Sequence, residues 1–162
     1  MTEEKSAEQF IYRKLVLFLS SNGGLGYAPI APGTFGTLAG IPAFYYLSRF
    51  SWPLQLITLV AILFLSFWAC DIAGKYYDEA DDGRIVIDEL IGYLITTAFL
   101  PFSWPTAILG FIWFRIFDIV KPPPANWFDR EMKNGLGVTL DDVMAGIYAA
   151  ILLRICLALF SS

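Results

Sequence analysis

The chain has 162 residues, of which 57% are hydrophobic, 17% aromatic and only 16% charged. A soluble domain usually carries about a quarter charged residues and about half apolar ones. The composition therefore favours an integral membrane protein over a soluble all-α domain with an unusually apolar core. The formal net charge of −4 argues against a nucleic-acid-binding protein, which needs a basic face to displace counterions. A chain of this length predicts a single domain, residues 1–162.

The first 20 residues predict an amphipathic arm. Their start is acidic and their apolar run is too short for a secretory signal peptide. Apolar residues recur there at helical spacing, with two basic residues between them: Phe10, Ile11, Leu15, Phe18 and Leu19, with Arg13 and Lys14. The pattern is typical of a short helix on a membrane surface, although packing against the protein core would produce it equally well.

The segment 22–40 is rich in glycine, and it places Thr34 and Thr37 where a helix is expected to begin. Glycine lets backbone N–H groups approach an anion closely, and a helix N-terminus attracts phosphate. The GxxxxGK[ST] pattern of nucleotide-binding loops is absent. The segment therefore predicts a phosphate contact that includes both threonines, or a tight turn that re-enters the membrane, or both.

Five apolar stretches predict an all-α, polytopic bundle of about four to five membrane helices behind the amphipathic arm. A helix needs about 20 apolar residues to cross a hydrocarbon core about 30 Å thick. The stretches are Leu38–Phe50, Pro53–Ala73, Ile85–Leu100, Trp104–Val120 and Val143–Phe160. Pro53–Ala73 meets this length outright, whereas Leu38–Phe50 crosses fully only if its helix begins earlier in the chain.

The polar segments between these stretches predict the orientation. If all five stretches cross, the N-terminal arm and segments 74–84 and 121–140 lie on one side, and they hold eight of the eleven basic residues. By the positive-inside rule this side is cytoplasmic, with the N-terminus inside and the C-terminus outside. Cys70 and Cys156 then fall near opposite ends of their spans, too far apart for a disulfide.

Ionisable groups at membrane depth are costly and usually functional. Three predicted spans bring such groups to the same side of the membrane. They are Asp88 and Glu89 in the third span, Arg115, Asp118 and Lys121 on one face at the end of the fourth, and Asp141 and Asp142 at the start of the fifth. Taken singly, each could be a helix-start acid or part of a stabilising ion pair. Their convergence predicts a shared catalytic site.

The predicted site suits a divalent ion and a phosphate. Five close carboxylates cannot all remain ionised without cations, and a hard ion such as Mg²⁺ binds carboxylate oxygens together with water and substrate phosphate. The expected Mg²⁺ ligands, direct or through water, are Asp88, Glu89, Asp118, Asp141 and Asp142. One of these carboxylates is the candidate general base for an attacking water. Arg115 and Lys121 are candidate phosphate ligands.

The residue content also narrows the chemistry. The chain has no histidine, which excludes Ser-His-Asp catalysis and a phosphohistidine intermediate. Neither cysteine is followed by an arginine six residues on, and the DxDx[TV] pattern of an aspartyl nucleophile is absent. Attack by metal-activated water is left, with direct attack by a carboxylate as the weaker alternative.

Four separated blocks carry a more specific signal: GYAPIAPGTFGTLAGIP, DDGRIVIDELIGY, FRIFDIVKPPPANWFDR and GLGVTLDDVMAG. In this order they resemble the phosphatidylglycerophosphatase A family of bacterial inner-membrane enzymes, and the likeness runs from about Leu17 to the C-terminus. The resemblance implies a Mg²⁺-dependent phosphatase that converts phosphatidylglycerophosphate to phosphatidylglycerol. That lipid's phosphate lies at the cytoplasmic headgroup level, so the active site would face the cytoplasm.

Matched by position, the family's motifs fall on the charged residues already singled out. They fall on Asp88 and Glu89, on Arg115, Asp118 and Lys121, and on Asp141 and Asp142. Where the family usually has Asp-Pro, this chain has Asp81-Asp82, which leaves open which of the two acids matters.

Other classes of protein remain open at this point. A small transporter or channel would use Asp88, Glu89 and Arg115 to line an ion pathway, but its charges would be spread through the membrane depth. A structural subunit without turnover would not need acids and bases together. Within the enzyme class, a phosphatase of another phospholipid or of a prenyl phosphate remains open, because no residues that read the headgroup are evident. No protein partner is evident either.

Overall fold

The computed structural model describes residues 3–160, and this part of the chain folds into seven α-helices and one 3-10 helix, without a strand. The all-α prediction is confirmed. In chain order the elements are α1 Glu3–Ser20, η1 Leu25–Tyr27, α2 Pro32–Leu47, α3 Trp52–Tyr77, α4 Ile87–Thr97, α5 Trp104–Val120, α6 Ala125–Glu131 and α7 Gly135–Phe160. The first two residues of the predicted arm lie outside the described residues.

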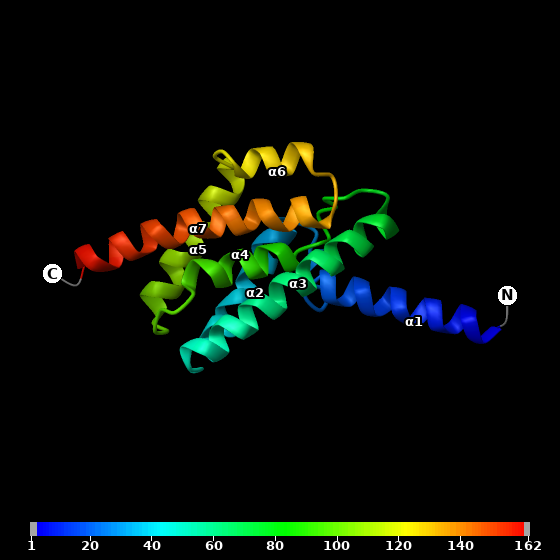
Figure 1. The fold of residues 1–162 in the computed structure, drawn as a ribbon, viewed down its shortest axis with the longest axis horizontal. Helices are drawn as coiled ribbons and strands as arrows, with labels where there is room; N and C mark the ends of the chain where they lie inside the picture. Colours follow the sequence, from blue (N-terminus) through cyan, green and yellow to red (C-terminus); the bar gives the residue numbers. More distant parts are fainter. Residues whose placement is uncertain (1–2, 161–162) are drawn as a thin grey trace.

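The short helix α4 forms the centre of the bundle (Figure 1). It contacts α2, α3, α5 and α7, and every one of its residues is buried or half-buried. Ile91, Tyr93 and Leu94 fill the core around it. The hydroxyl of Tyr93 donates a hydrogen bond of 3.1 Å to the carbonyl oxygen of Ala107 on α5, so the buried phenol is satisfied.

The helices of the bundle alternate in direction, so the starts of α2, α4 and α7 meet the ends of α3 and α5. We call this the polar end. There the side chain of Asn22 donates a hydrogen bond of 2.6 Å to the carbonyl of Val86, just before α4. At the opposite end, Arg154 donates a hydrogen bond of 2.7 Å to the carbonyl of Ala98, just after α4. Polar side chains thus satisfy the backbone at both ends of the central helix.

Two of the five predicted stretches, α3 and α7, form helices that are long and apolar enough to cross a membrane. Their exposed side chains include Ile57 and Phe64 on α3 and Ile151 and Ile155 on α7, a surface suited to lipid. The other three form shorter helices. At about 1.5 Å rise per residue, the 11 residues of α4 cover about 16 Å. Helix α4 is therefore too short to cross the hydrocarbon core, which Ile85–Leu100 was expected to do.

Helix α1 packs one side against the protein core and leaves other apolar side chains exposed. Val16 is buried against Ala69, Cys70 and Ala73 of α3, whereas apolar residues on its other sides are exposed: Phe10, Ile11, Leu15 and Phe18. The helix extends beyond the bundle at the polar end (Figure 1). One face therefore packs against the protein, and the remaining apolar side chains are free to meet a membrane surface.

Helix α7 begins at Gly135, and this corrects the prediction that Asp141 and Asp142 start the last span. The side chain of Asn134 accepts a hydrogen bond of 3.0 Å from the backbone N–H of Gly137 and so caps the earlier start. The two aspartates consequently lie in the second turn, beyond the free N–H groups of the helix start. The helix dipole alone does not explain their presence there. Cys70 and Cys156 are unpaired, as predicted.

Candidate active site

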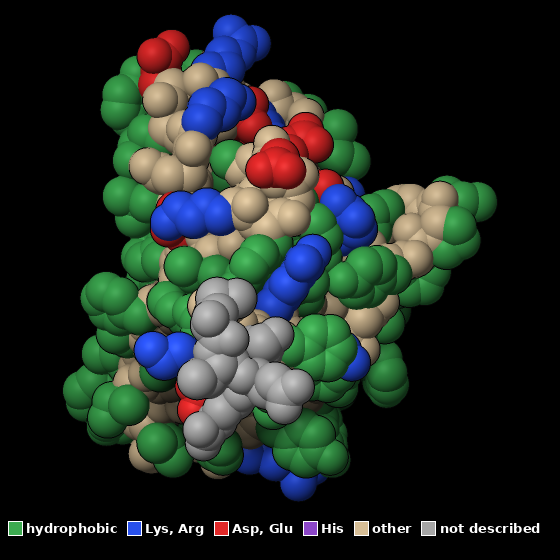
Figure 2. Space-filling model, turned by 90° about the vertical axis from the view of Figure 1, so that its right-hand side faces the viewer, with side chains coloured by type: hydrophobic (Ala, Val, Ile, Leu, Met, Phe, Trp, Pro, Cys, Tyr) green, Lys and Arg blue, Asp and Glu red, His purple; other side chains and the backbone are tan. Residues whose placement is uncertain are grey.

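A cavity of about 320 Å³ opens at the polar end, and all seven charged residues predicted for the site line it. They are Asp88, Glu89, Arg115, Asp118, Lys121, Asp141 and Asp142. Figure 2 looks onto this end of the molecule and shows acidic and basic side chains interspersed over it, with hydrophobic side chains around them. The site charges thus gather at one end of the bundle, which suits an enzyme site. The charges of an ion pathway would instead be spread through the membrane depth.

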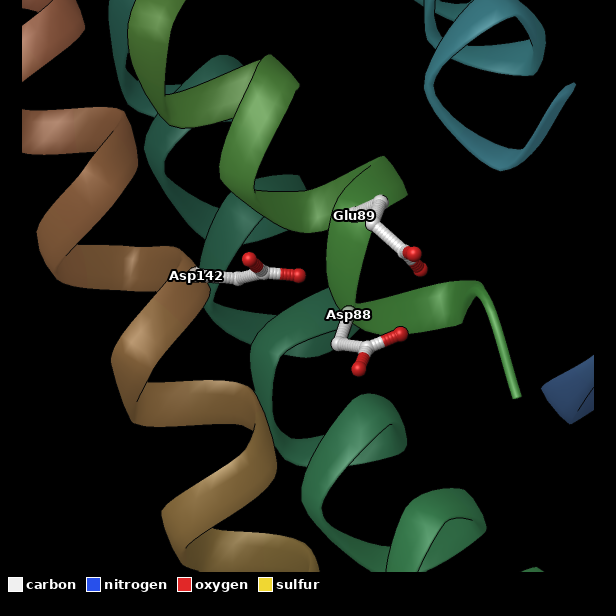
Figure 3. A group of neighbouring side chains, drawn as sticks. All are labelled: Asp88, Glu89 and Asp142. Carbon is white, nitrogen blue, oxygen red and sulfur yellow. The ribbon is translucent and has the colours of Figure 1, made fainter. Parts of the chain in front are cut away.

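Three carboxylates converge on the floor of the cavity. Asp142 extends from α7 toward the start of α4, which carries Asp88 and Glu89 (Figure 3). One oxygen atom of each side chain lies within 4.8 Å of the other two. Asp88 Oδ1 and Glu89 Oε2 are buried without a hydrogen-bond partner among the described residues. Buried polar atoms are normally paired, and carboxylate oxygens at this spacing are suited to a hard divalent ion.

Two glycines one turn deeper bring these carboxylates together. Gly92 follows Asp88 by four residues on α4, and Gly146 follows Asp142 by four residues on α7, so each glycine shares a helix face with its acid. A Cβ atom on Gly146 would lie 2.4 Å from the carbonyl oxygen of Gly92. The backbones of α4 and α7 are therefore in direct contact just below the acids, which only glycine permits.

The other two predicted metal ligands are each paired with a cation. Arg115 donates to Asp118 one turn further along α5. Lys121 donates hydrogen bonds of 2.6 Å to Asp141 and 2.7 Å to Asp129. The structure thus divides the five predicted ligands into three that converge and two that accept from basic side chains, although all five line the same cavity.

Lys121 remains a cation in this setting. Burial alone would lower the pKa of Lys121, but its hydrogen bonds to Asp129 and Asp141 outweigh burial and raise that pKa above its ordinary value. The same hydrogen bond from Lys121 lowers the pKa of Asp129. The end of α5 therefore supplies a fixed positive charge to the cavity that the converging carboxylates line.

The glycine-rich segment meets the cavity at residues 31–33 and not at its two threonines. Gly33 lines the cavity, and a Cβ atom there would lie 2.3 Å from Glu89 Oε1 and 3.2 Å from Arg115 Nη1. Thr37 is fully buried and donates to the carbonyl of Gly33, and neither Thr34 nor Thr37 is among the residues that line the cavity.

Between the two adjacent acids left open by the sequence, Asp81 lines the cavity. Asp82 instead accepts hydrogen bonds from the backbone and side chain of Arg84. Asp129 is the acid that the sequence reasoning missed. It lies on α6, a helix that no periodicity predicted, and its only signal was its place in the block that contains Lys121.

The comparison with known proteins decides the family. A family model described as Phosphatidylglycerophosphatase A matches residues 18–157. The chain belongs to this family. It is 39% identical to Phosphatidylglycerophosphatase A of Escherichia coli over 128 residues, which cover 78% of this chain and 74% of that protein. It is 36% identical to the protein of the same name from Haemophilus influenzae, with 93% and 94% covered.

Membership of the phosphatidylglycerophosphatase A family makes the chain a phosphatase, as the sequence blocks predicted. A relative from Bacteroides thetaiotaomicron, 36% identical over 87% of this chain and 92% of its own length, is provisionally named a phosphatidylinositol-3-phosphatase. No solved structure matches the chain. The seven charged cavity residues predicted from the sequence, together with Asp81, are therefore the candidate catalytic machinery of a lipid phosphatase.

Proposed function

We propose that the protein hydrolyses the terminal phosphate monoester of phosphatidylglycerophosphate, with Mg²⁺, to give phosphatidylglycerol and phosphate in phospholipid biosynthesis. The observation that carries the proposal is the convergence of Asp88, Glu89 and Asp142 in one cavity that Arg115 and Lys121 also line, at the end of an apolar bundle. Family membership supplies the substrate class.

The residues on the floor of the cavity fit Mg²⁺. Asp88, Glu89 and Asp142 offer oxygen ligands, and two of the three carboxylates have a buried oxygen that no described residue contacts by a hydrogen bond. When bound there, a divalent ion would offset the negative charges of the carboxylates and of the substrate phosphate. Few protein ligands and an open side are typical of magnesium sites that also bind a phosphate.

The basic residues hold the phosphate. Arg115 presents its guanidinium to the cavity from α5 and is oriented by Asp118, while Lys121 is fixed between Asp129 and Asp141. Both would bind non-bridging phosphate oxygens and stabilise the charge of a loose transition state. Because these side chains are already positioned by ion pairs, little reorganisation is needed when the substrate arrives.

In the hydrolysis itself, the oxygen of a water molecule forms a bond to phosphorus as the bond from phosphorus to the glycerol oxygen breaks. A cavity carboxylate accepts the proton of the attacking water, and the departing glycerol oxygen takes up a proton to become a hydroxyl. The absence of histidine from the chain leaves carboxylates as the residues suited to this proton transfer at neutral pH.

The proposed location is the bacterial inner membrane, with the cavity at the cytoplasmic headgroup level. The exposed apolar surfaces of α3 and α7 support a multi-pass membrane protein. Most basic residues belong to segments at the polar end, which the positive-inside rule assigns to the cytoplasm. Reporter fusions should place the N-terminus inside and the C-terminus outside, and both ends on one side would refute this orientation.

The experiment that tests the function is an assay of purified protein against a panel of lipid phosphates. Phosphate release should be fastest from phosphatidylglycerophosphate, should stop on chelation and should return with Mg²⁺. Asp142→Asn should remain folded but release no phosphate, while Asp82→Asn, whose acid is paired with Arg84, serves as the matched control. Faster release from phosphatidylinositol 3-phosphate would overturn the substrate, and full activity in chelator would overturn the metal requirement. Ion flux without phosphate release would favour a transporter.

A further inference from the structure

The rim of the cavity changes from charged to apolar between the start of α2 and the end of α5. Ala31 and Ile119 line the cavity on this side. Ile119 is 72% exposed, and Ile30, next to Ala31, is 78% exposed. Just inside the same opening lie Gly33 and Arg115. A phosphate ligand on the inside and large apolar side chains on the outside are what a lipid phosphate requires.

An apolar stripe continues from this opening along α5. Ile108, Ile112 and Ile119 are all exposed, and their spacing places them on one side of the helix, with Arg115 between Ile112 and Ile119 on that side. At 1.5 Å per residue, the stripe from Ile119 to Ile108 is about 16 Å long, close to half of a hydrocarbon core about 30 Å thick. Its length thus matches one leaflet.

A second apolar groove lies on the other side of α5, but it is separated from the cavity. Its lining includes Pro123 and Tyr148, and it shares no residue with the cavity. The hydroxyl of Tyr148 donates a hydrogen bond of 2.6 Å to the carbonyl of Pro123, which joins α7 to the segment after α5. Lys121 joins the same two parts of the chain through Asp141. Hydrogen bonds that join α7 to the end of α5 therefore separate this groove from the phosphate site.

We propose that the lipid substrate enters laterally between α2 and α5, and that one of its acyl chains lies along Ile119, Ile112 and Ile108 while Arg115 binds its phosphate. The inference deepens the proposed function and rests on it only in that the ligand is a lipid phosphate. The occupant of the stripe is the substrate's own chain, because the stripe is continuous with the phosphate cavity through Ile119. Free phosphate would use Arg115 but would leave the stripe to bulk lipid.

Site-specific photo-cross-linking tests this route in the full-length enzyme. The photo-reactive amino acid p-benzoylphenylalanine replaces Ile112 on the stripe, Ile151 in the rival groove or Ile57 on the lipid-facing side of α3. The protein is placed with Mg²⁺ in phosphatidylcholine vesicles. These vesicles contain a small fraction of a radiolabelled, non-hydrolysable phosphonate analogue of phosphatidylglycerophosphate. Labelling at position 112 should exceed labelling at positions 57 and 151 by about tenfold, and Arg115→Gln should remove the excess.

Each other outcome contradicts the proposal. Equal labelling at the three positions would show that the stripe holds only bulk lipid, and an excess at position 151 would assign entry to the α5–α7 side. An excess at position 112 that survives Arg115→Gln would separate the stripe from the phosphate site. The proposed function fails differently: wild-type protein would release no phosphate from the parent lipid, whether or not position 112 shows the Arg115-dependent excess.

Discussion

A single methyl group at position 146 tests whether catalysis depends on the backbone contact between α4 and α7. In Gly146→Ala, the new Cβ would lie 2.4 Å from the carbonyl oxygen of Gly92 and 3.2 Å from its carbonyl carbon. Both are backbone atoms, so no side-chain rotation can relieve the clash. Because ordinary contact begins at 3.4 Å, the two helices must move apart by about 1 Å in a closely packed interior.

The movement is expected to act on activity more than on stability. Asp142 and Asp88 lie one turn from the two glycines, so the separation passes directly to the converging carboxylates. A misplacement of about 1 Å in a catalytic group costs roughly a hundredfold in rate. The overpacking costs about 1–3 kcal/mol, but replacing a helical glycine by alanine returns about 1 kcal/mol. The fold should therefore survive the substitution.

The assay compares phosphate release with thermal unfolding for Gly146→Ala and a matched control. Gly110→Ala places a methyl group in α5, where its nearest neighbours are side-chain methyl groups of Thr97 and Leu153 at 3.0 and 3.4 Å. These can adjust, so the control should keep its kcat/KM within a few-fold of wild type. Wild-type kcat/KM and Mg²⁺ dependence in Gly146→Ala would refute the reasoning, and so would an equal loss in both variants.

Further substitutions address Gly33, Arg115 and the ion pair of Lys121 with Asp129. Gly33→Ala should lower kcat/KM by at least about tenfold, since its Cβ would clash with Glu89 Oε1; unchanged kinetics would show that Glu89 is free to move. Arg115→Lys keeps the charge but loses the planar fork, so KM should rise severalfold, measured by initial rates at varied substrate concentration. The pKa of Asp129 is lowered by Lys121, so its ionised form stabilises the folded state above about pH 4. The Tm of wild type should thus exceed that of Asp129→Asn at neutral pH, and the difference should vanish as pH falls below 4.

The sequence was sufficient to predict the class of fold and seven of the charged residues that line the cavity, because both depend on composition and on the placement of rare charges. The predicted Thr34 and Thr37 do not line it. It was less informative about helix length. Ile85–Leu100 is as apolar as a membrane span, but hydropathy does not distinguish burial in lipid from burial in protein. Helix α4 is enclosed by four other helices, so 11 residues are enough. Helix α6 is too short to show a periodicity.

The pairing within the site could not be predicted for a related reason. The charges of Lys121 and Asp141 were evident, but their contact depends on how α5 and α7 pack, and Asp129 reaches Lys121 only because α6 folds back after the prolines. Gly92 and Gly146 gave no usable signal either, whereas Gly33 belonged to the glycine-rich segment that the sequence already singled out. In a sequence, a glycine within a helix indicates only a weak helix former. Its structural role here is to allow close contact with another part of the chain, which the sequence does not show.

The enclosure of α4 separates two of the candidate catalytic acids from changes in the surrounding lipid. A bilayer that thickens or thins acts on the helices that its lipids contact, chiefly by changing their tilt. In this protein the helices with exposed apolar side chains include α3, α5 and α7. Asp88 and Glu89 belong to a helix whose neighbours are protein, and the backbone contact at Gly92 and Gly146 carries Asp142 along with them. Turnover in vesicles of short-chain and long-chain phosphatidylcholine should accordingly differ little, and a steep dependence on chain length would show that the three acids are coupled to the membrane after all.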